Sequence, residues 1–232
     1  IYYGVFEPEG GTAVNRIEQV FRKSENQKKP VTVHCVTAGL HTPPAGLARR
    51  MEAAGGICEL RGRMDAEALC RLAGSLRRQM QDEVPLVLSL SFHQIFICGL
   101  EHFTDLCTEA GVDGVRVPDL PMEEQPQLKV YLLKKGAPKL IQEICPQSGD
   151  RIPDITAYAQ GYVYCTADPA LWTSREEYGN PLLFFLYAAE AVCPVPLILD
   201  FPKGEEKWLS ACLKTAAGMT VKEDIAVPAL FC

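Results

Sequence analysis

The chain has 232 residues, of which 47% are hydrophobic and 22% are charged, so it has enough apolar material for a sizeable core and is not a disordered protein. Its length matches the roughly 250 residues typical of one eight-fold barrel, and we expect residues 1–232 to form a single domain. The net charge is −6 and the basic residues are scattered, which excludes the basic patch of a nucleic-acid-binding protein.

No apolar run approaches the ~20 residues needed to span a bilayer, and residues 1–11 lack the basic start of a secretion signal. We therefore expect a cytoplasmic protein with no membrane partner. The ten cysteines contain no Cys-x-x-Cys pair, and Cys35, Cys58, Cys145 and Cys165 lie in apolar runs. They fit small buried hydrophobic residues in a reducing compartment. The cysteines and the four histidines show no metal-ligand pattern, so we expect no metal and no cofactor.

Strand and helix patterns alternate along the chain, as in repeated βα units. A helical pattern over residues 12–26 comes first. Strand patterns follow at residues 31–37, 57–60, 86–90, 114–117, 139–144, 162–166 and 197–201. Helical patterns occupy residues 44–54, 66–80, 100–110, 122–135, 152–158, 181–191 and 205–217. A weaker eighth strand is expected within residues 219–230, without a closing helix.

This order predicts an α/β fold, a (β/α)8 barrel with an extra N-terminal helix and a truncated eighth unit. An open doubly wound sheet is the alternative, although no glycine-rich dinucleotide loop follows the first strand. Side chains alternate between the two faces of a strand. We expect the inward residues to include Val33 or His34, Glu59, Val87 or Leu88, Val115 or Arg116, and Tyr164, with Glu59 open toward the C-terminal face.

The segment Glu109-Ala-Gly-Val-Asp-Gly-Val-Arg-Val-Pro-Asp-Leu-Pro121 resembles the α chain of tryptophan synthase. The likeness continues in order through residues 16–21, 36–39, 57–60, 84–88, 95–96 and 161–164. The resemblance implies a barrel lyase of tryptophan biosynthesis. Such a lyase cleaves indole-3-glycerol phosphate to indole and glyceraldehyde 3-phosphate, and passes the indole to a pyridoxal-phosphate β chain. The implied partners are therefore a tryptophan synthase β chain and a small-molecule ligand.

Retro-aldol cleavage needs one group that protonates the indole ring carbon and another that removes a proton from the glycerol hydroxyl. The resemblance places the family's proton-shuttling glutamate at Glu59, at the end of the second strand. Tyr164 also matches the family, although a strand tyrosine is more often simply packed. The alternative for Glu59 is a structural carboxylate that a neighbouring lysine or a water molecule satisfies.

The loop after the second strand is short. Where the family continues from Glu-Leu-Gly into a long loop that carries a second acid, this chain reads Glu59-Leu60-Arg61-Gly62-Arg63-Met64-Asp65 and enters a helix. Asp65 is a candidate substitute for that acid, but it is better explained as the N-cap of the helix. Arg61 and Arg63 suit the binding of an anion.

The family's phosphate site depends on glycine-rich turns after strands six, seven and eight, because glycine lets the backbone approach an anion. Here Trp172-Thr173 replaces a Thr-Gly pair, Pro202 stands where a glycine is expected, and Val227-Pro228 replaces Gly-Ser. Proline has no N–H to donate. We therefore expect an occluded phosphate site and an impaired reaction.

Four further residues, Ser91, His93, Asp119 and Glu143, are candidates for contact with a substrate. Ser91 takes the place of an aromatic residue, His93 that of an asparagine, and Asp119 matches the family or shapes its turn. Of Gln142 and Glu143, one must point inward, and a hydrogen-bonded core glutamine is favoured over a recast polar pocket. Three functions remain open: an impaired family lyase, a non-catalytic relative that binds a β chain or another barrel, and a barrel recast for a non-phosphorylated ligand.

Overall fold

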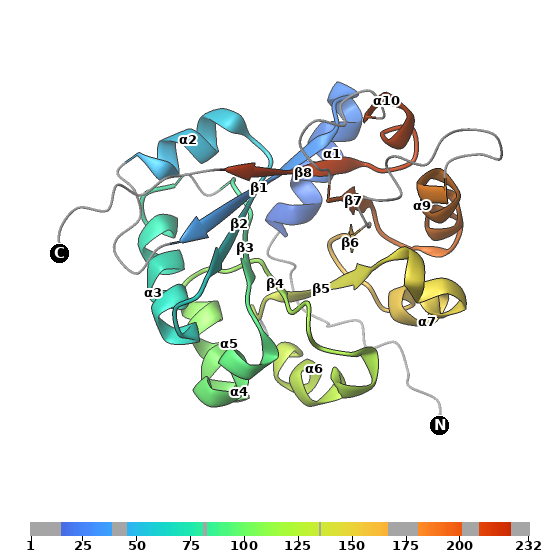
Figure 1. Ribbon diagram of the computed structural model, residues 1–232. Coiled ribbons are helices and arrows are strands. Elements are labelled where there is room, and N and C mark those ends of the chain that lie inside the picture. Colours follow the sequence, from blue (N-terminus) through green and yellow to red (C-terminus); the bar gives the residue numbers. More distant parts are fainter. Residues whose placement is uncertain are drawn as a thin grey trace.

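The computed structural model describes residues 15–38, 46–80, 83–134, 136–166, 181–200 and 209–223. Eight parallel strands form a closed barrel in chain order, and β8 pairs with β1 to complete it (Figure 1). The strands are β1 (Val31–Ala38), β2 (Ile57–Gly62), β3 (Leu86–Ser89), β4 (Gly114–Arg116), β5 (Lys139–Ile144), β6 (Val163–Cys165), β7 (Leu197–Leu199) and β8 (Gly218–Glu223). The predicted (β/α)8 barrel is confirmed, and the open doubly wound sheet is wrong.

Helices surround the barrel in the expected alternation (Figure 1). They are α1 (Arg16–Gln27), α2 (Leu47–Ala54), α3 (Ala66–Arg77), α4 (Phe92–Cys98), α5 (Leu100–Glu109), α6 (Pro126–Leu132), α7 (Ile152–Thr156), α9 (Pro181–Val192) and α10 (Leu209–Cys212), with 3-10 turns η1 (Met122–Glu124) and η2 (Pro146–Arg151). The N-terminal helix was predicted. Its Ile17 and Phe21 pack against residues at the strand starts, including Val31 and Tyr162, so α1 covers that end of the barrel.

The observed helices differ from the predicted ones in three places. The single helix expected over residues 122–135 is divided into η1 and α6, because Pro126 begins a new helix at its first position, where its missing N–H is tolerated. Helix α4 was not predicted, although Ser91 and Gln94 form the capping box that begins it. Of the helix expected over residues 205–217, residues 205–208 lie outside the described part, and α10 ends at Cys212.

Alternate strand residues face the barrel interior and the surrounding helices. Val33 and Val87 belong to the interior cluster, whereas Leu88 and Val115 pack in the outer cluster beneath the helices. The inward members of the predicted pairs are therefore Val33, Val87 and Arg116, the last of which contacts interior Glu59. This register places polar side chains near the C-terminal ends of the strands inside the barrel.

Gln142 and Glu143 on β5 also divide between the two faces. Gln142 exchanges two hydrogen bonds with Gln125, of 2.9 and 3.1 Å, whereas Glu143 points inward to Arg116. Gln142 is therefore a buried, hydrogen-bonded glutamine, as favoured from the sequence, but the inward-facing residue of the pair is Glu143.

Cys35, Cys58 and Cys165 are buried, whereas Cys145 is half-buried, and all four are free thiols. They behave as the small apolar residues that the sequence indicated. No helix in the described part of the chain has the length and apolar character needed to cross a membrane.

Candidate active site

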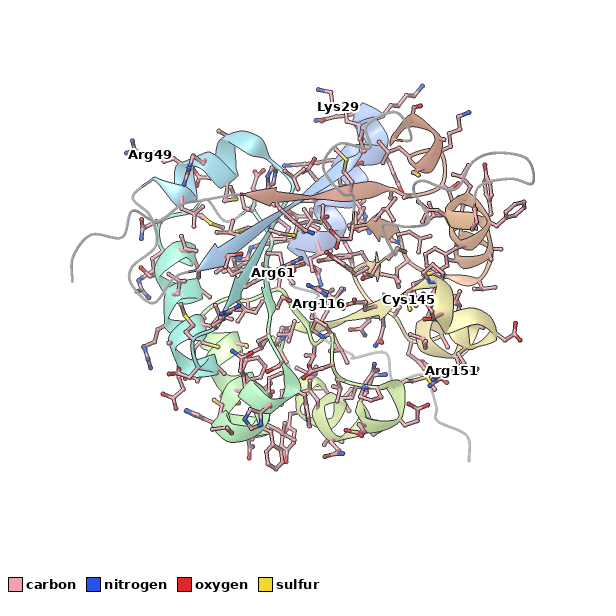
Figure 2. All side chains as sticks on the ribbon, viewed as in Figure 1. Lys29, Arg49, Arg61, Arg116, Cys145 and Arg151 are labelled. Carbon is pink, nitrogen blue, oxygen red and sulfur yellow. The ribbon has the colours of Figure 1, made fainter. Side chains whose placement is uncertain are left out.

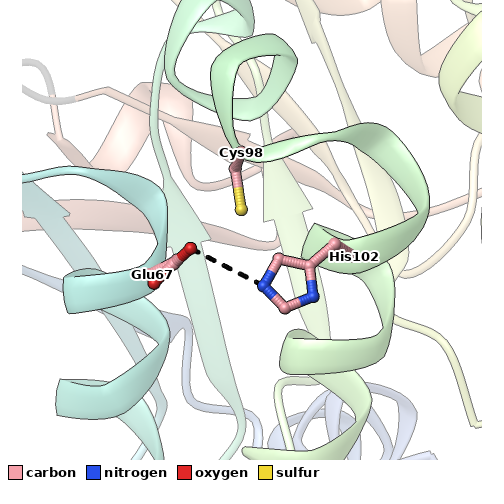
Figure 3. A group of neighbouring side chains, drawn as sticks. All are labelled: Glu67, Cys98 and His102. Carbon is pink, nitrogen blue, oxygen red and sulfur yellow. Dashed lines mark ion pairs between the residues drawn. The ribbon is translucent and has the colours of Figure 1, made fainter.

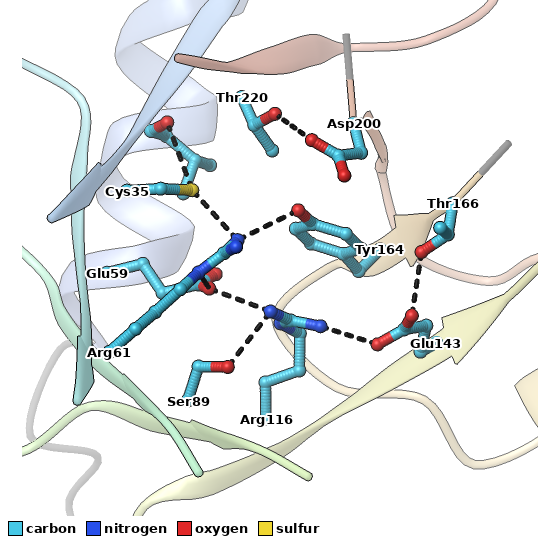
Figure 4. Close-up of polar contacts among 11 residues, drawn as sticks. Cys35, Glu59, Arg61, Ser89, Arg116, Glu143, Tyr164, Thr166, Asp200 and Thr220 are labelled. Atoms are coloured by element: carbon cyan, nitrogen blue, oxygen red, sulfur yellow. Dashed lines mark hydrogen bonds and ion pairs between the residues drawn. The ribbon is translucent and has the colours of Figure 1, made fainter. Parts of the chain in front are cut away.

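Glu59 lies inside the barrel on β2 and is 0% exposed. Its Oε1 atom accepts two hydrogen bonds, from Nε of Arg61 at 2.8 Å and from Nη2 of Arg116 at 3.0 Å (Figure 4). Arg61 can reach Glu59 because residues two apart on a strand share a face. The other carboxylate oxygen, Oε2, is buried and has no hydrogen-bond partner among the described residues. One oxygen of Glu59 is thus held by two cations.

Arg116, from β4, connects Glu59 to the opposite side of the barrel. Its Nη1 donates to Oε2 of Glu143 at 2.5 Å, and its Nη2 donates to Oγ of Ser89 at 2.9 Å. The guanidinium carbon lies 4.1 Å from the centre of the Tyr164 ring, in a cation–π contact. Burial lowers the pKa of Arg116, but the carboxylates of Glu59 and Glu143 more than offset it, and its pKa lies above the ordinary value.

Arg61 is the next inward residue after Glu59 toward the C-terminal end of β2, and its side chain is 27% exposed. Its Nη2 donates to the hydroxyl of Tyr164 at 3.0 Å and to Sγ of Cys35 at 3.1 Å. Figure 2 shows Arg61 and Arg116 at the centre of the barrel, in contrast to Arg49 and Arg151 at its edge. The two central arginines and the two glutamates form one network of balanced charge.

Tyr164 and Cys35 are poor candidates for a base or nucleophile. Burial raises the pKa of Tyr164, and the nearby Glu59 carboxylate raises it further. Burial, followed by the same carboxylate, raises the pKa of the Cys35 thiol to about 12. Both groups therefore stay protonated near neutral pH. The interpretation of Tyr164 as a packed residue holds for its ring, while its hydroxyl accepts from Arg61.

The structure corrects the predicted setting of Glu59. It faces inward, as expected, but it is fully buried rather than open toward the C-terminal face. Its partners are two arginines, not the lysine or water considered from the sequence. Arg116 was not identified as a site residue, although an arginine in the otherwise apolar strand Gly114–Arg116 is a signal that sequence reasoning could have used.

Other predicted site residues have structural contacts. Oδ1 of Asp65 accepts from the Ala68 backbone N–H at 2.7 Å, so Asp65 caps α3. Ser91 caps α4, and Oδ1 of Asp119 accepts from the Phe92 N–H at 2.8 Å, which fixes the start of the same helix. His93 is exposed on α4.

An open pocket of about 400 Å³ lies beside the arginine network. Residues at or just after the ends of β1, β2, β3 and β4 line it, including Thr37, Arg61, Arg63, Ser91 and Asp119. The structure therefore brings four of the predicted residues to one pocket.

Several predicted positions cannot be compared with the structure. Trp172, Thr173, Pro202, Val227 and Pro228 all lie outside the described residues. The predicted loss of the phosphate turns thus remains a prediction.

A family model matches residues 54–223, which is most of the chain, and its description is tryptophan synthase alpha chain. The chain belongs to the tryptophan synthase alpha chain family. The alpha chain of Alkaliphilus metalliredigens is 33% identical over 135 residues, covering 58% of this chain and 50% of that protein. The alpha chain of Geobacillus kaustophilus is 32% identical over 162 residues, covering 70% and 60%. The chain thus spans about half the length of the curated alpha chains it matches.

Solved alpha-chain structures share the barrel. The tryptophan synthase alpha chain of Legionella pneumophila superimposes with a TM-score of 0.74 at 22% identity, covering 90% of this chain and 86% of that chain. A chain from the Pyrococcus furiosus tryptophan synthase α2β2 complex gives 0.69 at 19% identity, covering 83% and 87%. At this identity the likeness shows the fold alone.

The position that carries Arg61 is a departure from the tryptophan synthase alpha chain pattern. The sequence resemblance implies Glu-Leu-Gly at the end of the second strand, whereas this chain has Glu59-Leu60-Arg61. A glycine could not reach the carboxylate, because it has no side chain. The arginine that replaces it makes the shorter of the two hydrogen bonds to Glu59.

Proposed function

We propose that this chain is a tryptophan synthase alpha-type barrel in which cleavage of indole-3-glycerol phosphate is strongly impaired. The observation that carries the proposal is the pairing of the Glu59 carboxylate with both Arg61 and Arg116. A proton-shuttling carboxylate must reach the substrate and change its protonation state during turnover. Glu59 is fully buried and paired with two arginines, so it cannot reach a substrate without leaving both ion pairs.

The size of the effect follows from the energetics of buried ion pairs. Removing one partner of such a pair typically costs ~3–5 kcal/mol, because the other charge is left uncompensated. Each ~1.4 kcal/mol added to a barrier slows a reaction about tenfold. Moving Glu59 out of its two ion pairs to reach a substrate carries a penalty of this order, so the rate is expected to fall by roughly 10²–10⁴.

Indole release from indole-3-glycerol phosphate tests the proposal, with the purified chain alone and with a tryptophan synthase β chain. We expect turnover at least ~10² below that of an ordinary alpha chain measured in parallel. The variant Glu59→Gln, shown to be folded by circular dichroism, should lose less than about twofold of the remaining rate. Turnover near that of the ordinary alpha chain, abolished by Glu59→Gln, would overturn the proposal.

The pocket beside the network favours a second candidate function, a barrel recast to bind a small non-phosphorylated anion. Arg61 is partly exposed in this pocket and Arg63 is exposed. A guanidinium can donate two parallel N–H hydrogen bonds to a carboxylate. Calorimetric titration with malonate, sulfate and glycerol 3-phosphate tests this candidate. We expect malonate to bind and Arg63→Met to weaken it. Tight binding of glycerol 3-phosphate that Arg63→Met does not affect would instead support a surviving phosphate site.

A tryptophan synthase β chain is the proposed protein partner. The support is family membership and the solved Pyrococcus furiosus complex, whose title describes mutual activation of its α2β2 assembly. Co-elution with a β chain in gel filtration is the direct test. If the chain binds a β chain but releases no indole, it is best described as a non-catalytic relative, the second of the three functions that the sequence left open.

A further inference from the structure

Three potential metal ligands from separate elements lie together outside the barrel, away from the arginine network (Figure 3). They are Glu67 in the first turn of α3, Cys98 at the end of α4 and His102 in the first turn of α5. Their ligand atoms all lie within 4.8 Å of one another. Within the part of the chain that the structure describes, this is the one such group of three.

Local structure brings the three side chains together. Asp65 caps α3 and so fixes the turn that carries Glu67. Gly99, with φ of 90°, separates α4 from α5 and creates the corner across which Cys98 and His102 meet. A left-handed φ of this kind is readily available to glycine. In Figure 3 the Cys98 sulfur points into the space between the carboxylate and the imidazole.

We propose that Glu67, Cys98 and His102 bind a zinc ion. Nε2 of His102 lies 3.6 Å from Oε1 of Glu67. The ligand atoms of a tetrahedral zinc ion are about 3.3–3.8 Å apart, given zinc–ligand bonds of ~2.0–2.3 Å. The imidazole and the carboxylate therefore already have the required separation, and the remaining adjustment falls on exposed side chains that can move.

The ligand types favour zinc over magnesium or calcium. A thiolate and an imidazole are the ligands that Zn²⁺ prefers, whereas Mg²⁺ and Ca²⁺ prefer oxygen ligands alone. Arg71 competes for Glu67, but its 3.3 Å contact is to the other oxygen, Oε2, and both side chains are exposed. An exposed pair of this kind is weak. The contact with Arg71 therefore leaves Oε1 of Glu67 directed toward His102.

The bound ion would join α3 to the α4–α5 corner and would keep its fourth position for water. Three protein ligands and one open position are the arrangement of many zinc sites. No sequence motif links the three residues, because Glu67 is far from the other two and Gly99 interrupts the helical spacing between Cys98 and His102. For this reason we expected no metal site from the sequence alone.

Cobalt binding tests the site, because Co²⁺ substitutes for Zn²⁺ and reports a thiolate ligand through a near-ultraviolet charge-transfer band. We expect chelator-treated protein to bind one Co²⁺ per chain with this band, and Zn²⁺ to displace it. Cys98→Ser should abolish the band, and Glu67→Gln and His102→Ala should weaken Zn²⁺ binding at least about tenfold. Zn²⁺ should raise the Tm of the unmodified protein and not that of Cys98→Ser.

Two matched variants control for non-specific metal binding. Cys193→Ser removes another half-buried thiol and should retain the band. Arg71→Met removes the competing ion pair and should bind zinc at least as tightly as the unmodified protein. The proposal is overturned if no band appears, if the band persists in Cys98→Ser, or if Glu67→Gln and His102→Ala bind zinc as tightly as the unmodified protein.

Discussion

Nη2 of Arg116 lies 3.0 Å from Oε1 of Glu59, and the two side chains are 6% and 0% exposed. Taking a carboxylate and a guanidinium out of water is unfavourable unless they are paired and hydrogen-bonded. Here Arg61, Ser89 and Glu143 supply further contacts to the same two groups. The pair is therefore part of the structure of the barrel interior, with measurable consequences for stability.

Replacing Arg116 by methionine should lower the free energy of unfolding by ~3–5 kcal/mol, because it leaves the buried Glu59 without one cation. Urea denaturation measures the loss. The control is Arg151→Met, which breaks an exposed pair with Glu123 and should change stability by ~0–1 kcal/mol. Adding Glu59→Gln to Arg116→Met should recover part of the loss. Equal effects of Arg116→Met and Arg151→Met would show that the buried pair does not matter.

Stability should fall in alkaline solution. Burial raises the pKa of Cys35 and of Cys58 from 9.0 to about 12. Between these values the unfolded chain releases thiol protons that the folded chain keeps, so the contribution is complete below pH 9 and is lost as pH rises toward 12.

The measurement is the free energy of unfolding as a function of pH. Each such thiol steepens the decline by up to ~1.4 kcal/mol per pH unit. Cys35→Ser, which removes one of them, should therefore give a shallower decline above pH 9 than the unmodified protein. An unchanged slope in this variant would argue against the raised pKa of Cys35.

Gly55 and Gly56 form a matched pair for a test of barrel packing. Both have positive φ, 70° and 83°, but a Cβ on Gly56 would overlap the carbonyl oxygen of Thr32, whereas a Cβ on Gly55 would meet open space. Gly55→Ala should cost ~1–3 kcal/mol, because φ of 70° with ψ of −177° is a conformation that essentially only glycine adopts. Gly56→Ala should cost more, because β1 and β2 must also separate locally. Thermal unfolding of the two variants checks this, and equal Tm values would contradict it.

Asp65 offers a test that separates capping from catalysis. Asp65→Ala should lower stability by ~0.5–2 kcal/mol through loss of the α3 cap, and Asp65→Asn should not, because asparagine is an equally good N-cap. Neither change should lower the residual rate of indole release relative to the unmodified protein. A rate that falls in Asp65→Asn while its stability is kept would restore Asp65 as an acid.

The sequence by itself determined the order of the elements and much of the site's position. Strand and helix periodicity is local, so seven strands could be inferred from neighbouring residues, whereas the eighth had only a weak signal. The inward face of Glu59 was expected from strand alternation together with the family resemblance. The cap at Asp65 is local for the same reason. The capping box of Ser91 and Gln94 was also present in the sequence, although helix α4 was missed.

Only the tertiary structure decided which groups face one another across the barrel. Glu59 and Arg116 come from β2 and β4, and their contact depends on strand register and on the reach of a long side chain. The Glu67, Cys98 and His102 group likewise depends on the angle at Gly99 and on the packing of α3 against α4 and α5. The contacts of Glu59 with Arg116 and of Glu67 with the α4–α5 corner join residues far apart in the chain, whereas sequence patterns report only the conformation of neighbouring residues.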